Sequence, residues 1–427
     1  METFYRILYN DLELDYYLEP GTFKVSFTTL EKIYSLYSNG TVLQVVKIPV
    51  ADHDSFIKNQ TTYMSLNKII CEEHSLYKME TYEKFGLDIR KNFHIVNKAS
   101  SADNIEFLDW WLNSGLKLKY GESAMDSSRY KSNGSALNWW LNSGLKLKYS
   151  PRAIDYASSI CNINTLNWWL NSGLELKYSP KAMNDASCMG HINVLNWWLN
   201  SGLQLKYDEA AISLASQYNR INVLDWWLSS GLELKYDESA IRIASQYNRI
   251  NVLDWWLSSG LKLKYDESAI RIASEYNLVN VLDWWLNSRL ELKYDEIDIL
   301  YIDVLNWWLK SGLEFKYTEK AINRASKWGL TNVLDWWVNS GLELKYTEEA
   351  MAFHNKKSIE WWITSGLPLK STENIIEWAS KNGHLCILKL WYEVGLPFSS
   401  VETLVKLATD FNQLEVVKWY QLNGFTS

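Results

Sequence analysis

The sequence predicts an all-α repeat solenoid, built from ankyrin-sized helix–turn–helix units and preceded by a small N-terminal α+β module. Two observations lead to this fold class. The 427-residue chain contains 24 tryptophans, and most of them stand in Trp-Trp pairs. The first six intervals between successive pairs are all 29 residues, and the next three are 23, 29 and 25 residues. The pairs begin at Trp110, Trp139, Trp168, Trp197, Trp226, Trp255, Trp284, Trp307, Trp336 and Trp361.

The repeat frame extends beyond the Trp-Trp pairs in both directions. It continues through Trp391 and Trp419, and it reaches back to Gly86, which stands 29 residues before Gly115. We therefore expect a repeat domain over residues 76–427, with about twelve units and a degenerate first unit.

Residues 1–75 differ from the repeats in residue pattern and form the expected N-terminal module. The segments 23–29 and 42–50 alternate or cluster β-branched and aromatic residues, as strands do, and a helical segment lies between them. No proline-rich or serine-rich linker follows, so the module should dock directly on the first repeat.

The first helix of each unit has a clear start in the sequence. In the unit 237–265, Asp237 is a favourable N-cap and Glu238 places an acid in the first turn. Ala240, Ile241 and Ala244 then form a narrow apolar stripe. Other units begin with Ser-Pro or Thr-Glu, which are also good helix starts.

The second helix carries the Trp-Trp pair. Asn248 and Arg249 break the first helix, and Gly260 follows the second helix as a left-handed C-cap. We expect the second Trp of each pair to be more buried than the first. The alternating tail 261–265 suits a short extended segment. The predicted buried stripe of the second helix consists of Val252, Leu253, Trp256 and Leu257.

The frame A-I-x-x-A-S, then N-V-L-x-W-W-L-x-S-G-L, resembles the second half of an ankyrin repeat. His191 and His384 keep the Gly-His turn of that family. The usual Thr-Pro-Leu-His opening is absent, and each unit is about four residues shorter than the common ankyrin repeat. The whole chain is most similar to ankyrin-repeat proteins of giant amoeba-infecting DNA viruses (mimivirus-type). Their front module has a stretch similar to the one running from Phe27 through Tyr37 to Pro49.

In ankyrin-like stacks the first helix lines the concave side, so the resemblance implies a recognition surface there. The units 208–236 and 237–265 agree at 25 of 29 positions, and three of the four differences fall on the first helix. Recent duplication without any ligand would explain this near-identity equally well. The candidate concave residues are Ser213, Arg242, Arg271, Tyr218, Tyr247, Tyr276 and Trp328, with Ile160 and Met189 at the same variable position.

Two sets of residues recur at the same position of successive units, and we call each set a column. Each column could serve packing or binding. The Trp column favours a packing seam, with a hydrophobic stripe for a partner as the alternative. The Lys-Tyr column, exemplified by Lys264-Tyr265, resembles the basic–aromatic interleaving of single-strand binders. However, a glutamate stands two residues before the lysine in many units, so a tyrosine filling the inter-repeat loop and a solvated lysine explain the column better.

The sequence offers few groups for catalysis or metal binding. Asp52-His53-Asp54 reads as an exposed loop, because adjacent residues rarely converge on one ion. No phosphate-binding, nucleophile-elbow or dinucleotide motif is present. We expect no catalytic residue, metal site or cofactor. The remaining histidines are scattered over different units: His74, His94, His191, His354 and His384.

Composition excludes several further classes. The net charge is −7 at pH 7, which gives no global attraction for nucleic acid. No apolar run has the roughly 20 residues that span a bilayer, and no secretory leader is visible. We expect an intracellular chain with no nucleic-acid or membrane partner. The cysteines are widely separated and read as free thiols: Cys71, Cys161, Cys188 and Cys386.

The sequence thus predicts a non-enzymatic scaffold for protein–protein interaction, and by resemblance its partners would be host or viral proteins. One alternative is a structural or particle-associated repeat protein. A second alternative is a substrate adaptor for a ubiquitin ligase, which would need an F-box or BTB element that we do not see.

We also expect a local defect in the repeat, with shortened units near 290–303 and 347–358. Arg289 replaces the C-cap glycine of its unit, although a side chain is strained in the left-handed region. The residues missing from both shortened units come from the first helix and its turn. A first helix of only one or two turns should loosen the stack there.

Overall fold

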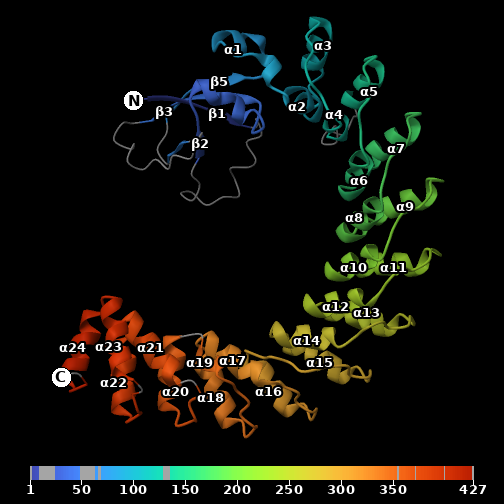
Figure 1. Ribbon diagram of the computed structural model, residues 1–427. Coiled ribbons are helices and arrows are strands. Elements are labelled where there is room, and N and C mark those ends of the chain that lie inside the picture. The colour runs from blue at the N-terminus through green and yellow to red at the C-terminus, as the bar shows by residue number, and fades with distance from the viewer. Residues whose placement is uncertain are drawn as a thin grey trace. The chain divides into compact units, whose positions relative to one another are not determined.

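The computed structural model describes residues 2–8, 25–48, 63–65, 69–127, 135–352, 355–370, 372–398 and 400–425. It confirms the predicted class, an all-α repeat solenoid with a small N-terminal α+β module (Figure 1). The chain divides into two compact parts, with the boundary inside the repeats. They are Met1–Lys235, called the N-terminal unit, and Tyr236–Ser427, called the C-terminal unit, and each is described by itself.

The N-terminal module is built on a three-stranded antiparallel sheet with the order β1-β3-β5. In its register Tyr5 pairs with Val45, and Val46 pairs with Ile70. A second pair of strands, β2 and β4, is also antiparallel. The predicted helical segment is a 3-10 helix, η2. The bounds are β1 Glu2–Leu8, β2 Val25–Phe27, η2 Leu30–Leu36, β3 Val42–Ile48, β4 Tyr63–Ser65 and β5 Ile69–Ser75.

The N-terminal unit continues with helices in pairs. After α1 and the 3-10 helix η4, each repeat contributes a first helix and a second helix. The bounds are α1 Met79–Lys84, η4 Ile89–Lys91, α2 Ile95–Ser101, α3 Ile105–Ser114, α4 Ser123–Asp126, α5 Ser135–Asn142, α6 Arg152–Ser159, α7 Ile163–Asn171, α8 Lys181–Met189, α9 Ile192–Asn200, α10 Ala210–Gln217 and α11 Ile221–Ser229.

The C-terminal unit follows the same pattern, with one interruption after α15. The bounds are α12 Glu238–Gln246, α13 Ile250–Ser258, α14 Ser268–Glu275, α15 Val279–Asn287, α16 Ile302–Lys310, α17 Glu319–Lys327, α18 Thr331–Asn339, α19 Glu349–Ala352, α20 Lys356–Thr364, α21 Thr372–Asn382, α22 Leu385–Glu393, α23 Val401–Asp410 and α24 Leu414–Leu422.

Local sequence signals set the helix boundaries as predicted. The Asp237 carboxylate accepts a hydrogen bond from the backbone N–H of Ser239 at 2.9 Å and so caps α12. Asn248 ends the first helix with φ of +56°, and Gly260 follows the second helix with φ of +74°. Arg289 adopts φ of +62°, so the strained left-handed cap expected there is present.

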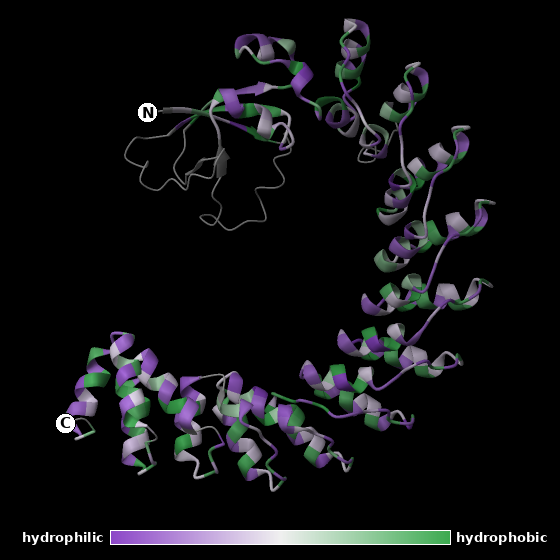
Figure 2. Ribbon diagram, viewed as in Figure 1, coloured by the Kyte–Doolittle hydropathy of each residue, from purple (hydrophilic) through white to green (hydrophobic). Residues whose placement is uncertain are grey.

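Each unit buries one stripe of each helix against its neighbours, and the helices of Figure 2 accordingly carry both hydrophobic and hydrophilic residues. Ala244, Val252 and Leu253 are completely buried, and Trp256 is 1% exposed. The prediction for Leu257 was wrong, because this side chain is 43% exposed. At about 100° per residue, position 257 lies roughly 90° from the centre of the buried stripe.

The first shortened unit lacks its first helix altogether. The prediction of a helix of one or two turns was wrong here, because residues 290–301 form no helix. Ile297 and Ile299 are buried in its place, and the Ile297 N–H donates to the Lys316 carbonyl at 3.0 Å. In the second shortened unit α19 is a single turn, as predicted. Residues 353 and 354 of that unit lie outside the described residues.

Candidate protein-interaction surface

The predicted aromatic positions lie at the C-terminal ends of the first helices. Most are the residue directly after the helix, where the chain turns toward the second helix. Their side chains are between 37% and 62% exposed, which is unusual for apolar groups of this size. We call them the first-helix row: Ile160, Met189 and Tyr218 in the N-terminal unit, and Tyr247, Tyr276 and Trp328 in the C-terminal unit.

The other predicted position of the first helix has a different role. Ser213 is buried, so it does not belong to an exposed surface, and Arg242 and Arg271 are only partly exposed. In the equivalent position Asp155 accepts hydrogen bonds from the backbone and the hydroxyl of Ser179 at 2.8 and 2.6 Å. Side chains here meet the start of the following first helix, so part of the variation between units reflects packing.

The carboxyl of Asp155, at this position of the first helix, is largely buried. Burial raises the pKa of Asp155 above its usual range, and the bonds from Ser179 partly oppose this effect. Asn184 makes the equivalent contact through its amide, which donates to Asp208 at 2.7 Å. These groups link successive units, and a helix start explains them without catalysis.

The two rings of each Trp-Trp pair have separate functions in packing. As predicted, the second ring is the more buried: Trp256 is 1% exposed and Trp255 is 8% exposed. The rings meet edge to face at 5.0 to 5.2 Å. The first ring also donates a hydrogen bond to an Asn or Asp of the preceding unit. This Asx–Trp ladder includes Trp168 to Asn138 at 2.7 Å, Trp197 to Asn167 at 2.7 Å, Trp284 to Asp254 at 2.7 Å and Trp336 to Asn306 at 2.8 Å.

In several units the second ring bonds to a serine hydroxyl of the preceding first helix, whereas the buried Nε1 of Trp256 and the Ser216 hydroxyl have no hydrogen-bond partner among the residues that the structure describes. Trp285 Nε1 donates to Ser245 Oγ at 3.2 Å, and Trp308 Nε1 donates to Ser274 Oγ at 3.0 Å. Trp337 follows the unit that lacks a first helix. Its buried Nε1 has no hydrogen-bond partner among the described residues.

The Lys-Tyr column is a structural ladder. The ring of Tyr265 packs on Trp285 at 5.1 Å, so the tyrosine fills the inter-repeat space as predicted. The lysine is exposed, as predicted, and it also contacts the tyrosine of the preceding unit. Lys293 Nζ lies 4.8 Å from the centre of the Tyr265 ring and donates to the Tyr265 carbonyl at 3.2 Å. Because the lysines are engaged in this way, the column is not an open basic groove.

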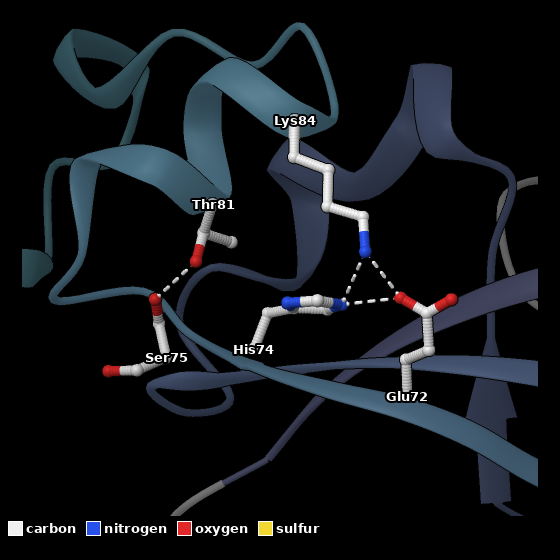
Figure 3. Close-up of polar contacts among 5 residues, drawn as sticks. All are labelled: Glu72, His74, Ser75, Thr81 and Lys84. Atoms are coloured by element: carbon white, nitrogen blue, oxygen red, sulfur yellow. Dashed lines mark hydrogen bonds and ion pairs between the residues drawn. The ribbon is translucent and has the colours of Figure 1, made fainter.

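The N-terminal module carries a polar cluster where β5 meets α1 (Figure 3). Glu72 Oε2 accepts from Lys84 Nζ at 2.6 Å and lies 2.8 Å from His74 Nε2. The hydrogen bonds from Lys84 and then His74 lower the pKa of Glu72. The Ser75 carbonyl accepts from Thr81 Oγ1, and the Ser75 hydroxyl accepts from the Tyr77 N–H.

A second polar contact joins the module to the first repeat. Lys98 Nζ donates to three backbone carbonyls, those of Tyr37, Ser38 and Gly40, at 3.0, 2.9 and 2.9 Å. Burial lowers the pKa of the Lys98 ammonium to about 8. This side chain holds the 37–40 turn against α2, as expected for a module docked without a linker.

The remaining sequence candidates for catalysis or metal binding are only partly among the described residues. Asp52-His53-Asp54 and His354 lie outside the described residues. Across the described part of the chain, no three His, Cys, Asp or Glu side chains gather as metal ligands would. Within the same ranges, no helix combines the length and the apolar character needed to cross a membrane.

No protein-family model matches the chain. It is 39% identical over 121 residues to an uncharacterized protein of Acanthamoeba polyphaga mimivirus. That match covers 28% of this chain and spans about 37% of the length of the viral protein.

Two solved structures show similar folds. The ankyrin repeat domain of human ASB11 matches with a TM-score of 0.33 and 14% identity, over 42% of this chain and 90% of that domain. The pentatricopeptide repeat protein PPR10, solved in complex with an 18-nt psaJ RNA element, matches with a TM-score of 0.35 and 11% identity. That second match covers 80% of this chain and 54% of PPR10.

Proposed function

We propose that this chain is a non-enzymatic, intracellular scaffold that binds proteins through the first-helix row. The observation that carries the proposal is the contrast between two kinds of position. The Trp pairs and the Lys-Tyr column, which recur in most units, are used in contacts between units. The first-helix row is Ile, Met, Tyr or Trp in different units, and it leaves these large apolar side chains exposed.

Such side chains are characteristic of protein interfaces. Tyrosine, tryptophan and methionine are enriched there, because they supply a large contact area with few rotatable bonds. Tyr247 and Tyr276 are 44% and 57% exposed, and each is the residue directly after a first helix. A repeated backbone that presents exposed apolar groups at the same position of several units is suited to binding a protein partner.

The identity with a mimivirus protein supports a viral origin, so the proposed partners are proteins of the virus or of its amoebal host. The experiment is affinity capture from infected and uninfected Acanthamoeba lysates, with the full chain as bait. The test variant combines Tyr247→Ser and Tyr276→Ser. The control variant combines Leu257→Ser and Leu286→Ser, two exposed leucines on the second helices of the same units.

The expected result is a protein captured in fixed stoichiometry by the wild type and the control variant, and lost with the test variant. Capture that the two variants reduce equally would contradict the proposal. Co-purification with viral particles alone would favour a structural role instead.

A further inference from the structure

A group of basic and aromatic side chains occupies the turns between first and second helices in the last part of the C-terminal unit. We call this group the turn edge. Its four lysines are exposed, and Trp328 and Phe411 are 62% and 48% exposed. The turn edge consists of Lys327, Trp328, Lys356, Lys357, Lys381, His384 and Phe411.

Contacts between successive turns make the turn edge continuous. The Asn355 amide donates to the Lys327 carbonyl at 3.3 Å, which brings the start of α20 beside the end of α17. At the next turn, burial and then the nearby charge of Lys356 lower the pKa of His384. Lys381 Nζ lies 4.6 Å from the centre of the Phe411 ring, at the turn after that.

Local helix stability explains only part of this charge pattern. Lys327 and Lys381 lie in the last turns of α17 and α21, where a cation is favoured by the helix dipole. Lys356 and Lys357 are the first two residues of α20, where the dipole disfavours a cation by about 0.3–1 kcal/mol each. The i,i+4 ion pair of Lys356 with Glu360 at 3.8 Å offsets part of this cost, so the dipole argument applies mainly to Lys357.

The acidic groups near the turn edge do not cancel its charge. Glu360 lies 3.8 Å from Lys356, Glu377 and Asp410 are on α21 and α23, and Glu415 in the first turn of α24 pairs with Lys418 at 3.3 Å. Apart from the Glu415–Lys418 pair, these carboxylates number three, against the four lysines of the turn edge. The chain as a whole carries −7, so the turn edge is basic on an acidic protein. The opposite ends of the same first helices carry Glu319, Glu348, Glu349, Glu373 and Glu402.

We propose that the turn edge binds an acidic segment of a protein partner. Carboxylates of the segment contact the four lysines, and its apolar side chains pack on Trp328 and Phe411. This inference rests on the proposed function and names the chemistry of the partner. An acidic segment is attracted to this edge, and the wider negative charge of the chain favours a short acidic stretch over a long polyanion.

The surroundings of the aromatic rings favour a protein segment as the ligand over a single-stranded nucleic acid. Base stacking needs open ring faces along successive units. Lys381 covers one face of Phe411, and the ring centres of His384 and Trp378 lie 4.2 Å apart with the rings tilted. Lys327 lies 5.8 Å from the centre of the Trp328 ring. The rings are thus partly occupied by the chain's own side chains, while the cations remain at the surface.

The test measures fluorescence anisotropy of a labelled Glu-Glu-Leu-Glu repeat peptide with the full chain at low salt. A Gln-Gln-Leu-Gln repeat peptide and an oligouridine of similar length are the comparison probes. The test variant combines Lys327→Glu, Lys356→Glu and Lys381→Glu. The control variant combines Lys262→Glu, Lys310→Glu and Lys389→Glu, which changes the net charge equally at exposed positions elsewhere in the same unit.

We expect the acidic peptide to bind, the neutral peptide not to bind, and the test variant to weaken binding by about ten-fold. The control variant should change the affinity by less than about two-fold. Absence of acidic-peptide binding, equal loss in both variants, or tighter oligouridine binding that the test variant abolishes would each overturn the inference. Circular dichroism of both variants checks that the fold is kept.

Failure of this inference can be told from failure of the proposed function. If the partner captured through Tyr247 and Tyr276 still binds the turn-edge variant with unchanged affinity, the turn edge is not its binding site. The scaffold proposal would then stand without the acidic partner.

Discussion

Replacing the second Trp of a pair by Phe should cost less at Trp337 than at Trp285, because only Trp285 has a hydrogen-bond partner. Both side chains are 1% exposed, and both meet the preceding Trp edge to face, at 5.1 and 5.2 Å. The lost ring volume is the same in both variants. Trp285→Phe also breaks the bond to Ser245, whereas Trp337→Phe removes an unpaired buried N–H.

The magnitude follows from these two differences. A lost hydrogen bond costs about 0.5–1.5 kcal/mol, and a buried unsatisfied group costs about 1–3 kcal/mol in the wild type. We therefore expect the free energy of unfolding to fall by about 2 kcal/mol more in Trp285→Phe than in Trp337→Phe. The stacking of Trp337 on Phe315 at 5.8 Å works in the opposite direction and limits the difference.

Native-state hydrogen exchange is the assay, because a repeat protein need not unfold in one step. The free energy of opening is compared between peptides from α15 and α18 in the wild type and in each variant. Trp308→Phe is the control and should resemble Trp285→Phe, since Trp308 bonds to Ser274 at 3.0 Å. Equal losses at Trp285 and Trp337 would refute the reasoning.

Three further outcomes are expected. Amides in Glu291–Asp303 should exchange faster than those in 237–265, because the first helix is missing there; equal protection would contradict this. Asp254→Ala should reduce the free energy of unfolding by about 1 kcal/mol through loss of the Trp284 bond, while Asp254→Asn, which keeps an acceptor, should cost less in the same urea titration. The pKa of Lys98 is lowered to about 8 by burial, so between pH 8 and 9.5 the native state binds fewer protons than the unfolded state and stability rises with pH. Lys98→Met should remove that rise, by up to about 1 kcal/mol per pH unit, and an unchanged slope would show that the Lys98 contact is not its source.

The sequence predicted the repeat fold well because its signals are local and recur in every unit. The N-cap at Asp237, the turn at Asn248 and the glycine cap at Gly260 each act within a few residues. The prediction of the buried stripe was wrong only at Leu257. This residue lies at the edge of the stripe, where a small change in helix rotation decides exposure.

Contacts between units could not be predicted in the same way. The Asx–Trp ladder joins residues 30 positions apart, such as Trp168 and Asn138, and the sequence signal was the polar residue that precedes nearly every Trp pair. The Lys293 contact with Tyr265 likewise depends on the spacing between neighbouring units. Ser213 was assigned to the surface because it varies, although its side chain is only 6% exposed.

The sequence pattern also did not predict that a segment without a helix replaces one first helix. A shortened unit suggested a shorter helix, but the segment around Ile297 and Ile299 is extended and places two isoleucines in the core. Side-chain volume rather than helix propensity decides that arrangement, and volume is a property of the neighbours as much as of the segment itself.

Site-specific photo-crosslinking tests the scaffold proposal most directly. A photoreactive phenylalanine analogue is placed at Tyr247 in one variant and at Leu257 in another, since both positions are exposed and lie in the same repeat. In amoebal lysate we expect one defined protein adduct from position 247 and none from position 257. The same adducts from both positions, or an adduct to nucleic acid at position 247, would contradict it.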